Sequence, residues 1–212
     1  MTENRSLSKR LTLYFSGLFI MALGVAISVR SDLGVTPISS VPYTATVVSG
    51  MDLGIATIVF SVVMVLLQIM VLRKDYRALD LLQLPIGIVF GLFLTFMDVL
   101  ARYVPDPSNP VVCFILMLVS TVFVAFGVTL YVSAGLIPLA PEGFMIAVSR
   151  VTGKRFSTVK VISDVTMVSI SLITCLIFVH GLGSVGVGTI VSAILVGNEV
   201  RFFSRRLGDR LR

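Results

Sequence analysis

The sequence predicts an all-α, polytopic membrane protein with about six transmembrane helices in two inverted three-span repeats, each containing one short re-entrant or broken helix. Composition is the first observation: hydrophobic residues make up 56% of the 212 residues and charged residues 13%, against roughly 25% charged in soluble domains. The second is several uncharged runs of about 19 residues, long enough to cross a bilayer as helix. A β-barrel would alternate apolar and polar residues, and these runs do not.

The third observation is a weak similarity of the chain to itself. At an offset of 103 residues, ALGVAISVRSDLG (22–34) aligns with AFGVTLYVSAGLI (125–137), and at an offset of 101 residues Gly87 meets Gly188. Each copy contains a long helix, an interrupted stretch, a long helix, a charged or Gly-rich link and a further long helix. We therefore expect a first membrane repeat over 11–104 and a second over 111–203, between cytoplasmic tails at 1–10 and 204–212.

The positive charges predict how the chain crosses the membrane. The expected spans are 11–29, 54–72, 81–100, 111–133, 156–179 and 184–201. With the N-terminus inside, only Arg30 and Arg102 of the 17 Lys and Arg residues fall outside, in accord with the positive-inside rule. Three spans per repeat invert the second repeat relative to the first. We expect a location in the bacterial cytoplasmic membrane with both termini in the cytoplasm.

The interrupted stretch of the first repeat is predicted to enter the membrane and turn back. A helix over 37–49 would be about 20 Å long, too short to span. Pro37 and its counterpart Pro141 suit the first turn of a helix, and the positive ends of two such half-helices favour negative charge nearby. The pattern predicts a central polar site for substrate binding or coupling, although two caps at ordinary loops would fit it too. Its predicted members are Thr36, Ser39, Ser40 and Glu142.

Charged residues in the fifth span extend this prediction. Lys160 and Asp164 lie four residues apart and so share one helical face. A charge at membrane depth needs a partner or a cavity, so the pair is interpreted as a substrate counter-charge or proton relay, or else as a structural ion pair. Arg30 and Asp32 flank the first re-entrant stretch and are candidates for a gate pair or a simple loop ion pair.

Small and uncharged polar residues are interpreted structurally. Gly143 follows the Pro141 turn, and Gly186 and Gly188 belong to the Gly-rich link GLGSVGVGT, which lacks the Lys of a phosphate loop. Gln68 and Gln83 are interpreted as polar links between helices.

Several function classes are disfavoured. No Ser–His pair is placed at membrane depth, and no metal-ligand cluster or cofactor motif is present, so we expect no enzyme, no metal and no cofactor. Cys113 and Cys175 each lie inside an apolar run and are interpreted as small hydrophobic residues. The net charge of +6 is distributed between the apolar runs rather than on one basic face, which disfavours a nucleic-acid partner.

Three segments resemble the YczE/YyaS/YitT family of bacterial integral membrane proteins. They are RSDLGVTP followed by LGIATI in the first half, and APEGFMIAVSRVTGKRFSTVKVISDV and GSVGVGTIVSAILVGNEV in the second. In that family the corresponding places tend to hold a Gly-Pro-Arg-Asp-Gly turn, an intramembrane Arg with a Glu four residues later, and a Gly-x-Gly-Thr link. Here they hold Ala140-Pro141-Glu142-Gly143, Lys160 with Asp164, and Gly186-Val187-Gly188-Thr189. The resemblance implies the fold and a membrane location, and this chain departs from it by using Lys for Arg.

These observations predict a small secondary transporter of a polar small molecule, anionic or zwitterionic. The two helix N-termini and Lys160 would favour an anionic group, and Glu142 and Asp164 would bind an amine or carry a coupling proton. The alternatives are a non-transporting accessory or assembly subunit and a channel. The expected partners are the lipid bilayer and the substrate, and a homodimer is left open.

Overall fold

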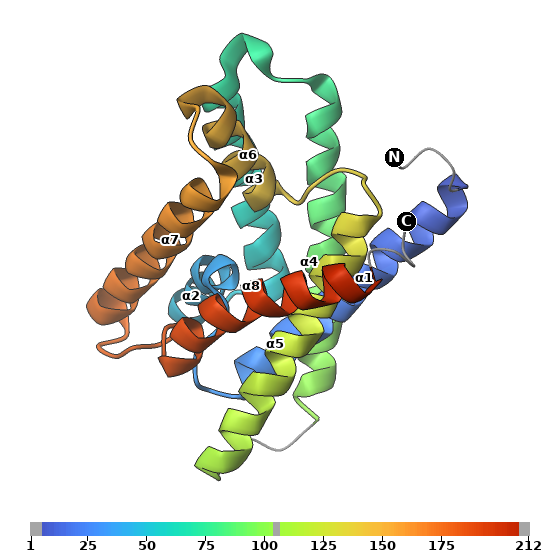
Figure 1. The fold of residues 1–212 in the computed structure, drawn as a ribbon. Helices are drawn as coiled ribbons and strands as arrows, with labels where there is room; N and C mark the ends of the chain where they lie inside the picture. The colour runs from blue at the N-terminus through green and yellow to red at the C-terminus, as the bar shows by residue number, and fades with distance from the viewer. Residues whose placement is uncertain (1–5, 104–106, 208–212) are drawn as a thin grey trace. The chain divides into compact units, whose positions relative to one another are not determined.

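The computed structural model describes residues 6–103 and 107–207, and these residues are helical throughout with short connections (Figure 1). The parts of the expected tails at 1–5 and 208–212 lie outside the described residues. The α-helices are α1 (Leu7–Arg30), α2 (Pro37–Ser49), α3 (Leu53–Leu72), α4 (Gln83–Ala101), α5 (Pro110–Ser133), α6 (Ala140–Thr152), α7 (Phe156–Phe178) and α8 (Val187–Leu207), with 3₁₀ turns at Arg73–Asp75 and Ala78–Leu82.

Six of the described helices are long and apolar enough to cross a membrane. They are α1, α3, α4, α5, α7 and α8, and they fall on the six spans expected from the sequence. Large apolar side chains on several of them are exposed, among them Met70, Val161, Ile173 and Ile190. The all-α polytopic fold class is therefore confirmed, and these helices imply contact with the lipid bilayer.

The interrupted stretch of each half of the sequence folds as one short helix. Both α2 and α6 have 13 residues, which corresponds to about 20 Å at 1.5 Å per residue. Pro141 occupies the first turn of α6, where its missing N–H leaves no helix hydrogen bond unmade. Gly153 ends α6 in the left-handed conformation with φ 67°, which glycine adopts without strain.

Side-chain caps set the starts of two long helices. Asp52 precedes α3, and its Oδ1 accepts hydrogen bonds from the N–H groups of Gly54 at 2.9 Å and Ile55 at 3.1 Å. Asn109 precedes α5 and accepts from the N–H of Val111 at 2.9 Å. These contacts satisfy first-turn N–H groups that have no partner within a helix.

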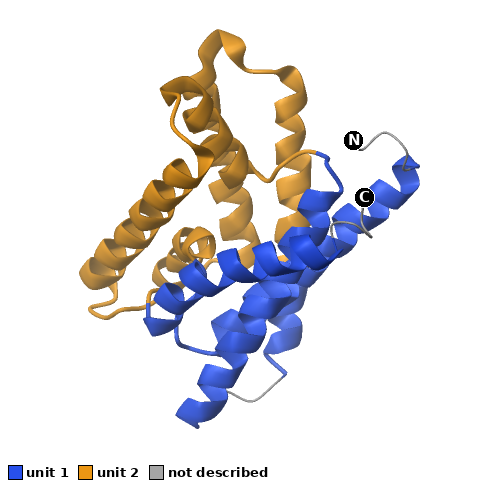
Figure 2. Cartoon of the chain, in the orientation of Figure 1, with its two compact units in different colours: residues 1–36, 96–136, 186–212 blue, residues 37–95, 137–185 orange. Residues whose placement is uncertain are grey.

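The chain divides into two compact units, and each unit draws on both halves of the sequence (Figure 2). Unit 1 comprises residues 1–36, 96–136 and 186–212, and unit 2 comprises residues 37–95 and 137–185. Unit 1 thus contains α1, α5 and α8, and unit 2 contains α2, α3, α6 and α7, with α4 divided at residue 96. The membrane repeats expected over 11–104 and 111–203 are sequence units that these compact units cut across, and they stay a prediction.

In unit 1, α1 and α5 lie side by side and run in opposite directions. Near the start of α1, Arg10 donates from Nε to the carbonyl of Ala134 at 2.9 Å, just past the end of α5. Further along, a Cβ on Gly24 would lie 2.7 Å from the backbone nitrogen of Val124, in the middle of α5. Because residue numbers rise along α1 as those of its contacts fall along α5, the pair is antiparallel.

In unit 2, each short helix packs against a long helix from the other half of the sequence: α2 against α7, and α6 against α3. A buried cluster joins three of these helices, with Phe60 on α3, Met145 on α6, and Val159 and Met167 on α7. The short helices are thus held by apolar contacts on the sides that carry these residues, and their first turns hold polar residues.

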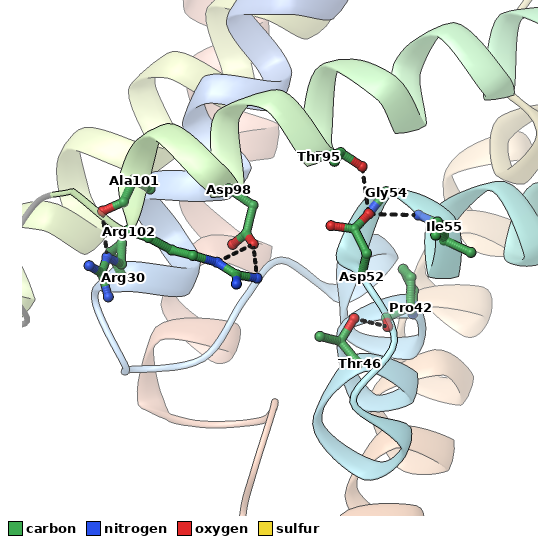
Figure 3. A network of polar contacts seen from close by, with 10 residues as sticks. All are labelled: Arg30, Pro42, Thr46, Asp52, Gly54, Ile55, Thr95, Asp98, Ala101 and Arg102. Atoms are coloured by element: carbon green, nitrogen blue, oxygen red, sulfur yellow. Dashed lines mark hydrogen bonds and ion pairs between the residues drawn. The ribbon is translucent and has the colours of Figure 1, made fainter.

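Figure 3 shows polar contacts near the ends of α3 and α4. In unit 2, Thr95 on α4 donates to Oδ1 of Asp52, which joins α4 to the cap of α3. In unit 1, Arg102 and Asp98 form an ion pair at 2.7 Å, and Nε of Arg30 donates to the carbonyl of Ala101 at 2.9 Å.

Candidate functional site

The first turns of α2 and α6 carry most of the residues predicted to form the polar site. Ser39 and Ser40 lie in the first turn of α2, and Glu142 lies in the first turn of α6. The N-cap residue of α6, Leu139, offers no side-chain hydrogen bond to that turn, so the start of α6 is shaped by Pro141 and by the residues packed on it.

Ser40 lies in a set of hydroxyl groups that we call the serine cluster, made of Ser40, Thr44, Ser171 and Ser184. The Oγ of Ser40 is fully buried, donates to the carbonyl of Pro37 at 2.7 Å and accepts from Ser171 on α7 at 3.0 Å. Thr44 donates to the carbonyl of Ser40 at 2.8 Å and also hydrogen-bonds Ser184. Since Thr44 has one hydroxyl proton, already used on Ser40, Ser184 is the donor in that contact. Each hydroxyl of the serine cluster is therefore satisfied within the protein.

The first turn of α6 is covered by two glutamine side chains, and we call Gln68, Gln83 and Gly143 the amide cluster. Gln68 on α3 is 3% exposed and Gln83 at the start of α4 is 1% exposed. A Cβ on Gly143 would lie 2.6 Å from Nε2 of Gln83 and 2.9 Å from Oε1 of Gln68. A Cβ at this position would require both amide groups to shift.

The amide oxygens of this cluster are not satisfied within the protein. Oε1 of Gln68 and Oε1 of Gln83 are both buried and have no hydrogen-bond partner. Leaving a buried acceptor without a donor costs about 1–3 kcal/mol, so two such atoms at one place are a large cost for a helix link. Glu142, which is half-buried, precedes Gly143 in the same turn.

Lys160 and Asp164 form an ion pair along α7, with Nζ of Lys160 at 2.9 Å from Oδ2 of Asp164. The Lys160 side chain is 42% exposed and that of Asp164 is 18% exposed. Oδ1 of Asp164 is buried and accepts no hydrogen bond. The carboxylate therefore keeps one acceptor for another group, and its role as counter-charge or relay stays a prediction.

Thr36, the remaining predicted site residue, lies in unit 1 and is 9% exposed. The structure thus groups Ser39, Ser40, Glu142, Lys160 and Asp164 in unit 2 and assigns Thr36 to the other unit.

The glycines predicted to shape the Gly-rich link are in close backbone contact in unit 1. The N–H of Gly188 donates to the carbonyl of Leu33 at 2.7 Å, and the N–H of Gly186 donates to Oγ1 of Thr189 at 3.2 Å. A Cβ on Gly188 would lie 2.7 Å from the oxygen of Leu33, so glycine permits this approach.

The candidate gate residues lie at the end of α1. Arg30 ends α1 and binds the carbonyl of Ala101, and Asp32 follows in the left-handed conformation with φ 53°. Their function as a gate stays a prediction. Among residues 6–103 and 107–207, no group of three His, Cys, Asp or Glu side chains is placed to hold a metal ion.

The sequence interpretation missed the partners of Ser40 and named Gln68 and Gln83 only as polar links between helices. Ser171, Ser184 and Thr44 carry no sequence signal beyond being hydroxyl residues in apolar surroundings. Gln68 did carry a signal, because it is the strongly polar residue within the apolar run of α3, but the sequence could not show that it meets Gln83 over Gly143.

The chain matches a known protein family over almost its whole length. The model of a family of unknown function, DUF6198, matches residues 8–205. The chain belongs to the DUF6198 family. It is also 27% identical over 195 residues to the uncharacterized membrane protein YczE of Bacillus subtilis (strain 168), covering 91% of this chain and 84% of that protein. No solved structure gives a significant match. The resemblance to a YczE-like family is therefore confirmed.

Proposed function

We propose that this DUF6198 member is a small secondary transporter of a polar, zwitterionic or anionic small molecule in the bacterial cytoplasmic membrane. The observation that carries the proposal is the pair of polar clusters at the first turns of two short helices, in a chain with six apolar helices. A helix of about 20 Å cannot cross a hydrocarbon core of about 30 Å. Irregular backbone at that depth is tolerated where it lines protein or a water-filled cavity, as in transporters.

The proposal includes two inverted repeats. Two facts support these repeats. First, α1 and α5 hold the same place in the two halves of the sequence and run antiparallel in unit 1. In unit 2, α2 packs on α7 while its counterpart α6 packs on α3. An exchange of partners of this kind is expected when one repeat is turned over relative to the other.

In this proposal the residues of unit 2 have distinct roles. The positive N-terminal end of α2, whose first turn holds no acidic residue, and Lys160 favour an anionic group. Glu142 and Asp164 bind an amine or carry the coupling proton, and Ser39 contributes to the same site. Ser40 holds the start of α2 through its hydrogen bonds with Pro37 and Ser171. Thr36 stays a predicted site residue. We assign no catalytic role to any of them, and place both termini in the cytoplasm.

The experiment is a thermal-shift screen of the purified full-length protein against small anions, zwitterions and cations. Compounds that raise the melting temperature are then tested for uptake and counterflow in proteoliposomes. A transporter should accelerate exchange of a labelled compound against an internal unlabelled one. A protein that binds a compound without exchanging it would reject transport and support the accessory-subunit alternative. Conductance under voltage would instead support a channel.

A further inference from the structure

The amide cluster contains two buried acceptors that converge on one place. Both amide groups lie within 3 Å of the position that a Cβ on Gly143 would occupy, and both amide oxygens lack a donor. Gln68 and Gln83 come from different helices, α3 and α4, and each is more than nine-tenths buried. Polar side chains that link helices normally hydrogen-bond to each other across the contact. Here neither glutamine oxygen accepts a hydrogen bond.

The open atoms define the chemistry of a ligand. A carbonyl oxygen only accepts hydrogen bonds, so the group that satisfies two of them must donate at least two. A primary ammonium group, with three N–H donors, meets this requirement. The charge of the neighbourhood agrees: the helix start contributes about half a positive charge, and the carboxylate of Glu142 in the same turn outweighs it.

The other charged groups placed on the helices around this turn do not reverse that sign. Lys160 is already paired with Asp164 on α7. The pair adds no net charge, and Arg150 lies at the opposite, exposed end of α6. The negative charge of Glu142 therefore remains, so a cation with N–H donors fits better than an anion, which that carboxylate would repel.

We propose that the amide cluster binds a primary ammonium group, with Oε1 of Gln68 and Oε1 of Gln83 as acceptors and Gly143 providing the space. This inference rests on the proposed function and names the amine end of its substrate. An amino-bearing zwitterion would place its ammonium here and its anionic group elsewhere in the site. Gln68 and Gln83 are then ligand-binding residues.

The test uses two probes of equal charge on the full-length protein. Methylammonium chloride offers three N–H donors, and tetramethylammonium chloride offers none. At matched ionic strength, methylammonium should raise the melting temperature in a saturable manner and tetramethylammonium should not. Equal shifts from both salts, no shift from either, or a saturable shift from sodium acetate alone would each overturn the ammonium assignment.

Methionine variants separate a binding role from a structural one. Gln68→Met and Gln83→Met keep the side-chain length and remove the open oxygen, so the ligand-free melting temperature should hold or rise. The half-maximal methylammonium concentration should increase at least about tenfold, because hydrogen bonds to a charged group are lost. A fall in the ligand-free melting temperature together with an unchanged methylammonium response would show that the glutamines are only structural.

Ser61→Ala is the matched control, because Ser61 is a buried polar residue on α3 whose hydroxyl donates within its own helix to the carbonyl of Thr57 at 2.9 Å. It should leave the methylammonium response intact. Should a methionine variant fail to fold, Gly143→Ala carries the test, since its Cβ displaces both amides. A full response in Gly143→Ala would refute the site.

The outcome is distinguishable from that of transport itself. Methylammonium binding that depends on Gln68 and Gln83, without counterflow in proteoliposomes, would keep the site and reject transport. Counterflow of a compound that is unaffected by Gln68→Met and Gln83→Met would keep transport and reject the site.

Discussion

Two clusters in unit 2 place polar side chains on the first turn of a short helix, and they are satisfied in different ways. In the serine cluster, Ser40 on α2 meets Ser171 on α7, and the hydroxyls bond to one another and to the backbone. In the amide cluster, Gly143 on α6 meets Gln68 on α3, and the amide oxygens have no partner. The offset of 103 residues that aligns the two halves pairs Ser40 with Gly143 and Ser171 with Gln68.

A second pair of positions shows the same contrast. The offset that relates the halves pairs Lys160 and Asp164 on α7 with Thr57 and Ser61 on α3. Thr57 and Ser61 donate to carbonyls of their own helix at 2.8 and 2.9 Å, whereas Lys160 and Asp164 form an ion pair that leaves one carboxylate oxygen open. Positions paired by the offset thus hold hydroxyls bonded to their own helix in one half of the sequence, and charged groups with one unbonded oxygen in the other half.

The contrast indicates which positions serve stability and which are available for a ligand. Polar groups that are hydrogen-bonded within the protein stabilise the fold and bind nothing further. Buried polar groups without a partner reduce stability until a ligand or water satisfies them. We expect variants of the hydrogen-bonded groups mainly to change stability, and variants of the groups that lack a partner mainly to change the response to ligand.

The largest effect is expected at the ion pair. The double variant Lys160→Met with Asp164→Leu should fold, because both charges leave together. Ligand-dependent uptake should fall by at least about 30-fold, since losing a charged partner of a bound ligand costs about 2–5 kcal/mol. The matched double variant Thr57→Val with Ser61→Ala should keep uptake near the wild-type value. Normal uptake by the first variant would make the pair purely structural.

The next effect is expected at Glu142 and its counterpart by the same offset, Ser39. Glu142→Gln keeps the shape of the side chain and removes the titratable charge, so ligand affinity or its pH dependence should be lost, by about 10- to 100-fold in half-maximal concentration. Ser39→Ala should weaken the same ligand by less, because it removes one neutral hydrogen bond at most. Thermal-shift titrations between pH 5 and 8 measure both. Equal and small effects would indicate that Glu142 only caps α6.

A smaller effect, on stability alone, is expected in the serine cluster. Ser171→Ala removes the donor to Oγ of Ser40 and should lower the free energy of unfolding by about 0.5–1.5 kcal/mol, the net worth of one hydrogen bond. Its ligand response should stay near that of the wild type. A loss of response larger than the loss of stability would place the serine cluster in the binding site and remove the contrast between the clusters.

Cysteine labelling at exposed positions tests the inverted repeats directly and does not depend on a change in stability or ligand binding. Single cysteines at Lys74 and Ser108, both exposed, should react with a membrane-impermeant maleimide from opposite sides, Lys74 from the cytoplasm. Lys74 is preferred to the neighbouring Tyr76, whose hydroxyl is buried, because a cysteine must be exposed to react. Cys113 and Cys175 are replaced beforehand. Reaction of both positions from the same side would contradict the inverted arrangement.

The sequence predicted the helices well because hydrophobic runs and helix-starting prolines are local signals. The six spans, the short helices at Pro37 and Pro141 and the family resemblance all follow from contiguous residues. It predicted the candidate site only in part: Ser40, Glu142 and the Lys160–Asp164 spacing were visible, since each is a local pattern. The contact of Gln68 and Gln83 with Gly143 could not be predicted, because these residues come from three segments that are distant in the sequence. No local pattern shows that the missing side chain of Gly143 leaves space for the two amides.

The most direct test of the account converts the open cluster into the residues of the closed one. The triple variant Gln68→Ser, Gln83→Ser, Gly143→Ser places at the amide cluster the residues that the two sequence offsets pair with it, Ser171, Ser184 and Ser40. Its response to methylammonium is measured by thermal shift, on protein shown by circular dichroism to keep wild-type helicity. We expect a folded protein whose melting temperature no longer responds to methylammonium. A triple variant that responds with the wild-type half-maximal concentration would contradict it.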